Sequence, residues 1–300
     1  MDEWMGDVRE SDGLILRDNA LHAGVDPDQI MKALRTGRLR RLQRGIYICR
    51  ADEVTPLALA RAAVLTTGIA DAVASHHTAA RVHGIPLPDG RGPEHVTVAR
   101  TQRRIRRKEL VFHSREMDLG DVDVHRGVPV TRPPRTLIDL LPVIEETAAV
   151  WAVDDSLRRR LVGRTELLTA LDARPGAPGD ALARTRVLSA DGKAESLLET
   201  AGRLALRNSE VPLPEAQYRV VAHDGSVFYL DGAYPEHMVG LEFDGQGVHS
   251  EPEALYRDRW RQNLLVAEGW TILRFTWWDI MHGKARFVAS VRSALGMTAP

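Results

Sequence analysis

Asp231, Glu242, Asp244 and His249 lie at the ends of two apolar runs, "VFYLDGAY" and "MVGLEFDGQGVHS". Two like unit charges about 4 Å apart repel by ~4 kcal/mol at an effective dielectric constant near 20, so clustered carboxylates usually have a cation to offset them or a proton to move. Hard oxygen ligands suit Mg²⁺ or Mn²⁺, and such an ion can activate water and orient a phosphodiester. We therefore expect Asp231, Glu242 and Asp244 to bind the metal and His249 to transfer a proton.

A simpler interpretation of the same acids stays open. Acidic residues at strand ends are often solvated turn residues, and Asp-Gly is a common turn pair. The sequence around the acids therefore has to be considered as a whole.

The surrounding pattern predicts elements in the order α-β-β-β-α-β. An amphipathic helix at 193–208 is followed by strands at 215–222, 227–234 and 238–245, a helix at 253–269, a strand at 270–276 and terminal helices at 277–295. Residues two apart on a strand share a face, so Glu242 and Asp244 should point the same way. Glu195 and Glu199 are four apart on the first helix and should close the site from the side.

Aromatic residues in this half are expected mainly to pack. We expect Tyr256, Trp260 and Trp270 to hold the second helix on the sheet rather than to stack on bases. Of Trp277 and Trp278, we expect one to be exposed.

Residues of about 190–295 resemble the PD-(D/E)XK nuclease superfamily, and within it the domain family related to the very-short-patch mismatch repair endonucleases. The resemblance is carried by "AESLLE", "LDGAYPE", "LEFDGQGVH", "YRDRWRQNLLVAEGW" and "ILRFTWWDI", and by a Gly fourteen residues after Asp231 with a His four residues beyond it. It implies that Asp231 is the main metal ligand, that Glu242 and Asp244 occupy the second strand position, and that His249 is catalytic. Glu195 matches the family's helical glutamate. Arg257, Asp258 and Arg261 match a helix that supports the site or contacts phosphate.

The sequence also departs from that family. The lysine that follows the second acid in the superfamily is absent, because Asp244 stands in its place, and the repair nuclease has a histidine there. The Cys/His zinc ligands of the repair enzymes are absent as well. The resemblance therefore supports the superfamily but not mismatch specificity.

A basic segment marks the front half of the chain. Residues 32–44 contain no acid and six cations, namely Lys32, Arg35, Arg38, Arg40, Arg41 and Arg44. Helical spacing over 8–23, a helix from about Asp26 to Gly37 and alternation around Arg44-Gly45 predict a winged helix-turn-helix, whose second helix enters the major groove while the wing contacts phosphate. A second basic run, 100–108, is either a phosphate-binding loop or a solvated surface.

Residues of about 14–140 resemble the N-terminal part of AbiEi-like abortive-infection antitoxins and related regulators. The matching stretches are "GRLRRLQRGIYI", "SHHTAARVHGI" and "RPPRTLIDL". The resemblance implies a winged helix-turn-helix followed by a small second domain. We expect His76, His77 and His83 to be core or capping residues, because no Cys or acid nearby completes a metal-binding set.

The bulk composition fits a protein with several domains. The chain has 300 residues, a formal net charge of −1 and a single cysteine, Cys49, which excludes an internal disulfide. No signal peptide or long apolar run is present, so we expect a cytoplasmic protein without a membrane partner. The Pro/Gly-rich stretch 172–181 marks a boundary. We expect an α/β (α+β) chain with a winged helix-turn-helix at 1–55, an AbiEi-like domain at 56–175 and a restriction-endonuclease-like domain at 190–300.

These features together predict a DNA-binding endonuclease that depends on Mg²⁺ or Mn²⁺. Double-strand cleavage by one nuclease domain would require a homodimer or two encounters. The alternative is an AbiEi-like transcriptional regulator or antitoxin with a silent nuclease fold, for which the missing lysine is the best support. An RNA substrate is also open, because a catalytic metal contacts the phosphate rather than the sugar.

Overall fold

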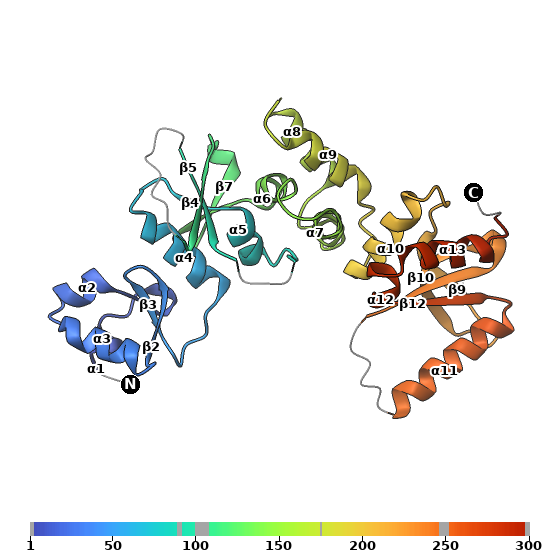
Figure 1. Ribbon diagram of the computed structural model, residues 1–300, viewed down its shortest axis with the longest axis horizontal. Helices are drawn as coiled ribbons and strands as arrows, with labels where there is room; N and C mark the ends of the chain where they lie inside the picture. The colour runs from blue at the N-terminus through green and yellow to red at the C-terminus, as the bar shows by residue number, and fades with distance from the viewer. Residues whose placement is uncertain (1–2, 89–91, 100–107, 175, 246–251, 298–300) are drawn as a thin grey trace. The chain divides into compact units, whose positions relative to one another are not determined.

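The chain has a mixed α+β fold, as predicted. The computed structural model describes residues 3–88, 92–99, 108–174, 176–245 and 252–297 (Figure 1). Its contacts divide the chain into two compact units, Met1–Ile144 with Val162–Ala183, and Glu145–Leu161 with Arg184–Pro300.

The first unit begins with short helices around a small antiparallel sheet of order β1-β3-β2. Its elements are α1 (Glu3–Asp7), β1 (Leu14–Leu16), α2 (Arg17–His22), α3 (Pro27–Arg35), β2 (Leu39–Gln43) and β3 (Ile46–Cys49). Helix α3 begins as the sequence indicates, because the Asp26 side chain accepts a hydrogen bond from Asp28 N and Pro27 occupies the first helical position. The β2–β3 hairpin turns at Gly45, whose φ of +74° is easily adopted only without a Cβ atom.

The predicted helix over 8–23 is wrong for its first half. Leu14 and Ile15 are in β1 instead, where they pair with Ile48 and Tyr47 of β3. Both are fully buried, Leu14 in one core cluster and Ile15 in another. Burial on both faces of a strand removes the alternation that would have marked it in the sequence.

The rest of the first unit is a mixed sheet of order β6-β5-β4-β8-β7 with helices packed against it. Its elements are α4 (Pro56–Thr67), β4 (Val73–Ala74), α5 (His76–His83), β5 (Glu94–Val98), β6 (Leu110–Ser114), β7 (Val122–His125), β8 (Val128–Thr131), α6 (Pro133–Leu140) and α8 (Arg164–Asp172). Strands β5 and β6 are parallel neighbours. Helix α9 (Asp180–Ser189) runs from the first unit into the second.

The second unit contains a sheet of order β12-β11-β10-β9, in which β11 and β12 are parallel. Its elements are α7 (Glu146–Arg158), α10 (Leu197–Arg207), β9 (Glu215–Val221), β10 (Val227–Tyr234), β11 (Val239–Asp244), α11 (Pro252–Ala267), β12 (Thr271–Thr276), α12 (Trp277–Met281) and α13 (Lys284–Ala294). From α10 to β12 this is the α-β-β-β-α-β order predicted from the sequence. Figure 1 shows α10 and α13 on one side of the sheet and α11 on the other.

Close packing joins α10 to the sheet. A Cβ atom added at Gly202 would lie 2.5 Å from Phe243 Cε1 of β11. The absent side chain therefore lets the helix approach the strand whose end carries Glu242 and Asp244. Phe243 and Leu241 pack in this core, as their alternation with the two acids requires.

Within the second unit, Asp154 links α7 to α10 and to the segment before α10. Its carboxylate is fully buried and accepts hydrogen bonds from Asp191 N (2.7 Å), Gly192 N (2.9 Å), Thr200 Oγ1 (2.8 Å) and Arg203 Nη2 (2.6 Å). The sequence placed the boundary of the last domain near 190, but these contacts group residues 145–161 with the C-terminal sheet. The physical reason is long-range charge pairing, which no local composition shift reveals.

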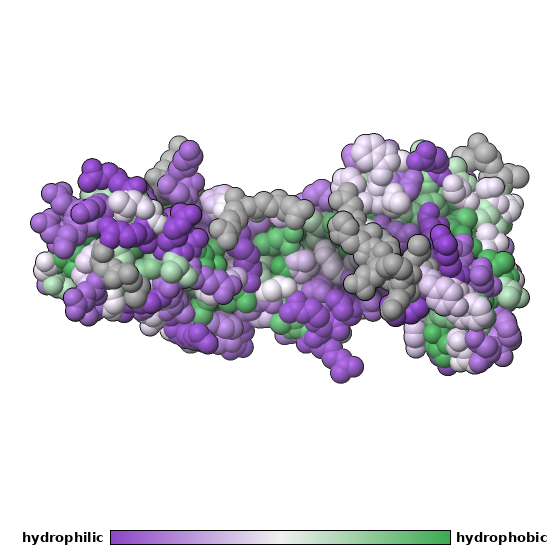
Figure 2. Space-filling view, turned by 90° about the horizontal axis from the view of Figure 1, so that it is seen from below, coloured by the Kyte–Doolittle hydropathy of each residue, from purple (hydrophilic) through white to green (hydrophobic). Residues whose placement is uncertain are grey.

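Hydrophilic residues cover most of the surface visible in Figure 2, and apolar residues there form small separate groups. None of the helices in the described part of the chain is long and apolar enough to cross a bilayer.

We expect Asp154→Asn to destabilise the second unit by ~3–5 kcal/mol, because it breaks the buried ion pair with Arg203 and leaves that guanidinium only the more exposed Asp191 carboxylate, 3.1 Å away. Five of the six tryptophans lie in that unit, so urea unfolding followed by tryptophan fluorescence will report it. The matched control is Glu146→Gln on the same helix. The side chains of Glu146 and its partner Arg207 are 46% and 34% exposed, so the loss of this pair should cost at most ~1 kcal/mol. Equal effects of the two variants would contradict this account.

Candidate functional site

Asp231 lies where strands β10 and β11 separate. Their pairing runs from Tyr234 opposite Val239 to Gly232 opposite Leu241 and stops there. One residue further, Asp231 Oδ2 accepts a hydrogen bond from Phe243 N at 2.8 Å. The carboxylate thus replaces the missing ladder partner and is held at the opening between the strands.

Negative charge collects around this carboxylate. Burial raises the pKa of Asp231, and the nearby charges of Asp244 and Glu195 raise it further, while the Phe243 N–H and the Arg261 guanidinium oppose the shift. Burial also raises the pKa of Glu199, and the charge of Asp231 adds to that effect. The structure therefore brings together several of the acids expected from the sequence, and their mutual repulsion favours a bound cation.

The two helical glutamates are arranged differently from the prediction. Helix α10 begins at Leu197, so Glu195 lies before it, exposed, and the expectation of one shared helical face is wrong. Glu199 is the half-buried member, and its Oε2 accepts hydrogen bonds from Glu195 N (2.9 Å) and Gln217 Nε2 (3.1 Å). Ser196 caps the helix, which explains why it starts at Leu197, four residues later than predicted.

Gln217 was missed by sequence reasoning. It lies on β9 between Ala216 and Tyr218, which pair with Gly232 and Leu230 on either side of Asp231. Only the strand register reveals this neighbour, because an isolated glutamine carries no signal of its own.

Glu242 is 5% exposed, and two arginine side chains form ion pairs with its carboxylate. Its Oε1 lies 2.6 Å from Arg261 Nη2 and its Oε2 lies 3.1 Å from Arg274 Nη2. Arg274 also donates two hydrogen bonds to Asp258, at 2.8 and 2.9 Å. Burial raises the pKa of Glu242, and both guanidiniums oppose that shift. Glu242 is therefore less available as a metal ligand than the sequence suggested.

The arginines of this group have partners within the fold. Besides Glu242, Arg261 binds the Tyr229 carbonyl at 2.7 Å. Arg274, which sequence reasoning did not single out, stands beside Glu242 in the parallel register of β11 and β12. Of the residues predicted to contact phosphate from α11, Arg257 is exposed.

The acids only partly fit a metal. Within the described ranges, three metal-ligating groups come within 4.8 Å of one another only at His76, His95 and His113, so Asp231, Glu242 and Asp244 do not converge to that degree. Asp231 and Asp244 offer hard oxygen atoms without an ion pair among the described residues, which suits Mg²⁺ or Mn²⁺. His249 lies outside the described residues, and its role stays a prediction.

Two aromatic side chains of α11 differ from expectation. Trp270 is buried, as predicted, but Tyr256 is 69% exposed and Trp260 is 53% exposed. They are four residues apart on the outward face of α11, whereas Leu264 and Leu265 provide its buried contacts. Trp278 is 63% exposed, while Trp277 packs against the core.

The basic residues of segment 32–44 differ in exposure and in hydrogen bonding. The exposed ones are Lys32, Arg35, Arg41 and Arg44. Arg40 is half-buried and donates to Asp52 O at 2.6 Å, and Arg38 donates to Thr36 Oγ1 at 3.0 Å.

Some of these cations border one of two separate hollows in the surface. Lys32 and Arg38 border one hollow, and Arg41 and Arg44 border another together with Arg17. Residues 100–107 of the second basic run lie outside the described residues.

No protein-family model matches the chain. Two uncharacterized Mycobacterium tuberculosis proteins, MT2308 of strain CDC 1551 and Rv2248 of strain H37Rv, are each 30% identical to it over 165 residues, which is 55% of the chain. The match covers 61% of each relative, less than two thirds of its length. The crystal structure of the RV2827C protein from M. tuberculosis is similar with a TM-score of 0.42 and 15% identity, over 73% of this chain and 87% of that one. These descriptions state no activity.

We expect Asp231→Asn to raise the unfolding midpoint of the metal-free protein at pH 7 by ~2–4 °C, the shift that corresponds to about 1 kcal/mol in a domain of this size. A raised pKa means that the folded state disfavours the charged form, so this destabilisation is present at neutral pH. It should vanish as the pH falls below about 4, where the unfolded carboxyl is also protonated.

Thermal unfolding in a chelator between pH 3.5 and 7 measures this effect. The control is Asp224→Asn, because hydrogen bonds with Ser226 lower the pKa of that exposed aspartate. Its substitution should leave the midpoint unchanged or slightly lower. A lower midpoint for Asp231→Asn at pH 7 would show that its charge is already compensated.

Proposed function

We propose that this chain is a DNA-binding, divalent-metal-dependent endonuclease that hydrolyses phosphodiester bonds at the Asp231 end of the C-terminal sheet. The observation that carries the proposal is the half-buried Asp231 carboxylate, held by Phe243 N between separating strands and surrounded by further acids. A fold gains no stability from such a group unless a cation or a proton compensates it.

The residues around Asp231 have different roles in this proposal. Asp231 and Asp244 would hold Mg²⁺ or Mn²⁺, which when bound would polarise the phosphodiester and activate water. Glu199, fixed by Glu195 N and Gln217 Nε2, would orient water at the edge of the site. His249 remains the expected proton-transfer residue, on the resemblance to the repair nucleases.

The arginine pairs around Glu242 support the site rather than bind DNA. Arg261 joins α11 to β10 and β11, and Arg274 joins β12 to α11 through Asp258. DNA contact on this unit is then proposed for exposed Arg257 with the neighbouring Tyr256 and Trp260 rings, because aromatic rings can stack on splayed bases.

The first unit would dock the chain on DNA. Lys32 and Arg35 on α3 would face the major groove, and Arg41 and Arg44 on the hairpin would bind backbone phosphate. The proposal includes a cytoplasmic location, and a homodimer where both strands are cut.

A second candidate function is a DNA-binding regulator or antitoxin with a silent nuclease fold. The specific observation in its favour is that two guanidiniums neutralise Glu242, in a chain that also lacks the expected lysine. RNA as the substrate is a third outcome that the same assays distinguish.

We expect Asp231→Asn to reduce cleavage by more than ~100-fold, the upper end of the loss seen when groups that merely support metal ligands are removed. The measurement is cleavage of single-stranded, duplex and mismatched DNA and of RNA in Mg²⁺ and in Mn²⁺. DNA binding should be retained, and Asp224→Asn serves as the folded control. Binding without cleavage by the parent protein would favour the regulator, and equal cleavage by Asp231→Asn would overturn the site.

We expect Arg41→Ala and Arg44→Ala each to lower the slope of log affinity against log salt by ~0.9 when the lost cation contacts a duplex phosphate. Fluorescence anisotropy between 50 and 200 mM salt measures the slope. The control is Arg132→Ala, an exposed arginine of the same unit outside the basic segment. A slope that falls equally in all three variants would indicate nonspecific attraction instead of a wing contact.

A further inference from the structure

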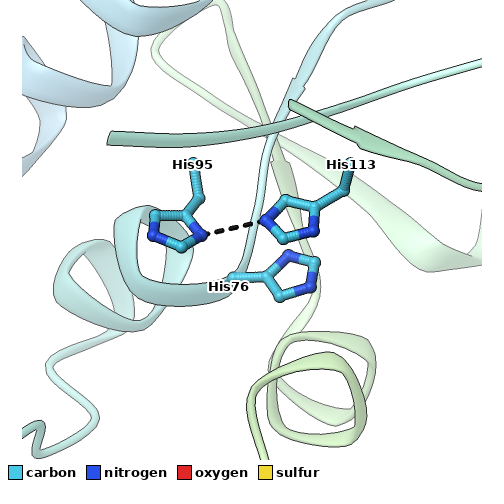
Figure 3. Close-up of side chains that lie close together, drawn as sticks. All are labelled: His76, His95 and His113. Atoms are coloured by element: carbon cyan, nitrogen blue, oxygen red, sulfur yellow. Dashed lines mark hydrogen bonds between the residues drawn. The ribbon is translucent and has the colours of Figure 1, made fainter. Parts of the chain in front are cut away.

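Three histidines that are distant in the sequence converge in the first unit. His76 is the first residue of α5, His95 lies on β5 and His113 lies on β6 (Figure 3). One nitrogen from each ring lies within 4.8 Å of the other two. His95 Nδ1 and His113 Nε2 are 2.9 Å apart, and the His76 ring stacks on the His113 ring with 3.5 Å between centroids.

The sheet register produces this arrangement. Strands β5 and β6 are parallel, with His95 opposite Val111 and Thr97 opposite His113, so the two histidines are diagonal neighbours on one face. Ser75 N donates to His95 O at 3.1 Å, which holds the start of α5 beside β5. His76 has a φ of +48°, an uncommon conformation for a residue other than glycine.

Outer hydrogen bonds orient the His76 ring. Its Nδ1 is 3.0 Å from Ser75 Oγ, which also accepts a hydrogen bond from Thr97 Oγ1 at 2.8 Å. A hydroxyl oxygen can accept two hydrogen bonds, so Nδ1 can donate here and leave Nε2 with its lone pair. Metal-binding histidines are commonly fixed by such a partner on the other ring nitrogen.

The rings of His76 and His95 are neutral at physiological pH. Burial, followed by repulsion from the neighbouring histidines, lowers the pKa of His76 to about 2, and burial lowers the pKa of His95 to about 3. Neutral imidazole is the form that binds metal. Of the nearby cations, Arg81 is paired with Glu94 at 2.6 Å.

We propose that His76, His95 and His113 form a binding site for a divalent transition metal of the zinc class. Imidazole ligands suit Zn²⁺, Cu²⁺ and Ni²⁺ better than Mg²⁺ or Mn²⁺. Three histidines leave a fourth position for water or another ligand, and His95 and His113 are partly accessible. On binding, the ring N–H between His95 and His113 moves to the other nitrogen of its ring, so that both rings present lone pairs to the ion.

This site is independent of the nuclease proposal. It lies in the other unit and differs from the carboxylates in ligand chemistry, so either proposal can fail alone. His83 belongs to neither site, because its Nε2 contacts the Thr131 carbonyl at 2.7 Å.

The test is Zn²⁺ titration by calorimetry of the full, untagged chain after chelator treatment, with Co²⁺ absorption as a second measurement. The Asp231→Asn background removes the carboxylate centre. We expect one ion per chain and Co²⁺ bands typical of tetrahedral coordination. His95→Gln and His113→Gln should each weaken Zn²⁺ binding at least ~10-fold, whereas His22→Gln, an exposed histidine of the same unit, should bind as the parent does.

Absence of Zn²⁺ binding by the parent, or unchanged binding by both glutamine variants, would overturn the proposal. Circular dichroism will show whether the variants fold. Should they fail to fold, X-ray absorption of the Zn²⁺-loaded parent decides, since three imidazole ligands support the site and fewer than three overturn it.

Discussion

The charge of Glu242 has to be compensated within the protein, and much of the C-terminal unit is organised around that requirement. A buried carboxylate is tolerated only with partners of good geometry. Arg261 from α11 and Arg274 from β12 supply them, and Arg274 is itself fixed by Asp258. These ion pairs hold α11 and β12 next to β11.

Asp231 is left in a different situation at the same end. It receives one backbone hydrogen bond, while Arg261 already serves Glu242 and the Tyr229 carbonyl. Two neighbouring strands therefore carry acids with opposite roles. Glu242 holds the structure together, and Asp231 keeps a charge that a ligand can satisfy. This contrast is the physical basis of the proposal that places chemistry at Asp231.

The first unit offers a different ligand chemistry. Its three imidazoles lie on a strand pair and a helix start, with a hydroxyl as outer partner, and the His76 and His95 rings are neutral. Imidazole nitrogens and hard carboxylate oxygens select different ions, so the two units can be loaded and tested separately.

The sequence by itself determined the local features: the capped start of α3, the hairpin at Gly45, the alternation that separates Glu242 and Asp244 from Phe243, and the α-β-β-β-α-β order. Each depends on residues a few positions apart, whose propensities and periodicity are readable directly. Only the tertiary structure decided which distant groups meet. Strand register placed Gln217 near Asp231, Arg274 beside Glu242 and His95 near His113, and helix packing exposed Tyr256 and Trp260. Burial on both faces made Leu14 and Ile15 a strand. Such pairings depend on which surfaces become buried together, and that information is distributed over the whole chain.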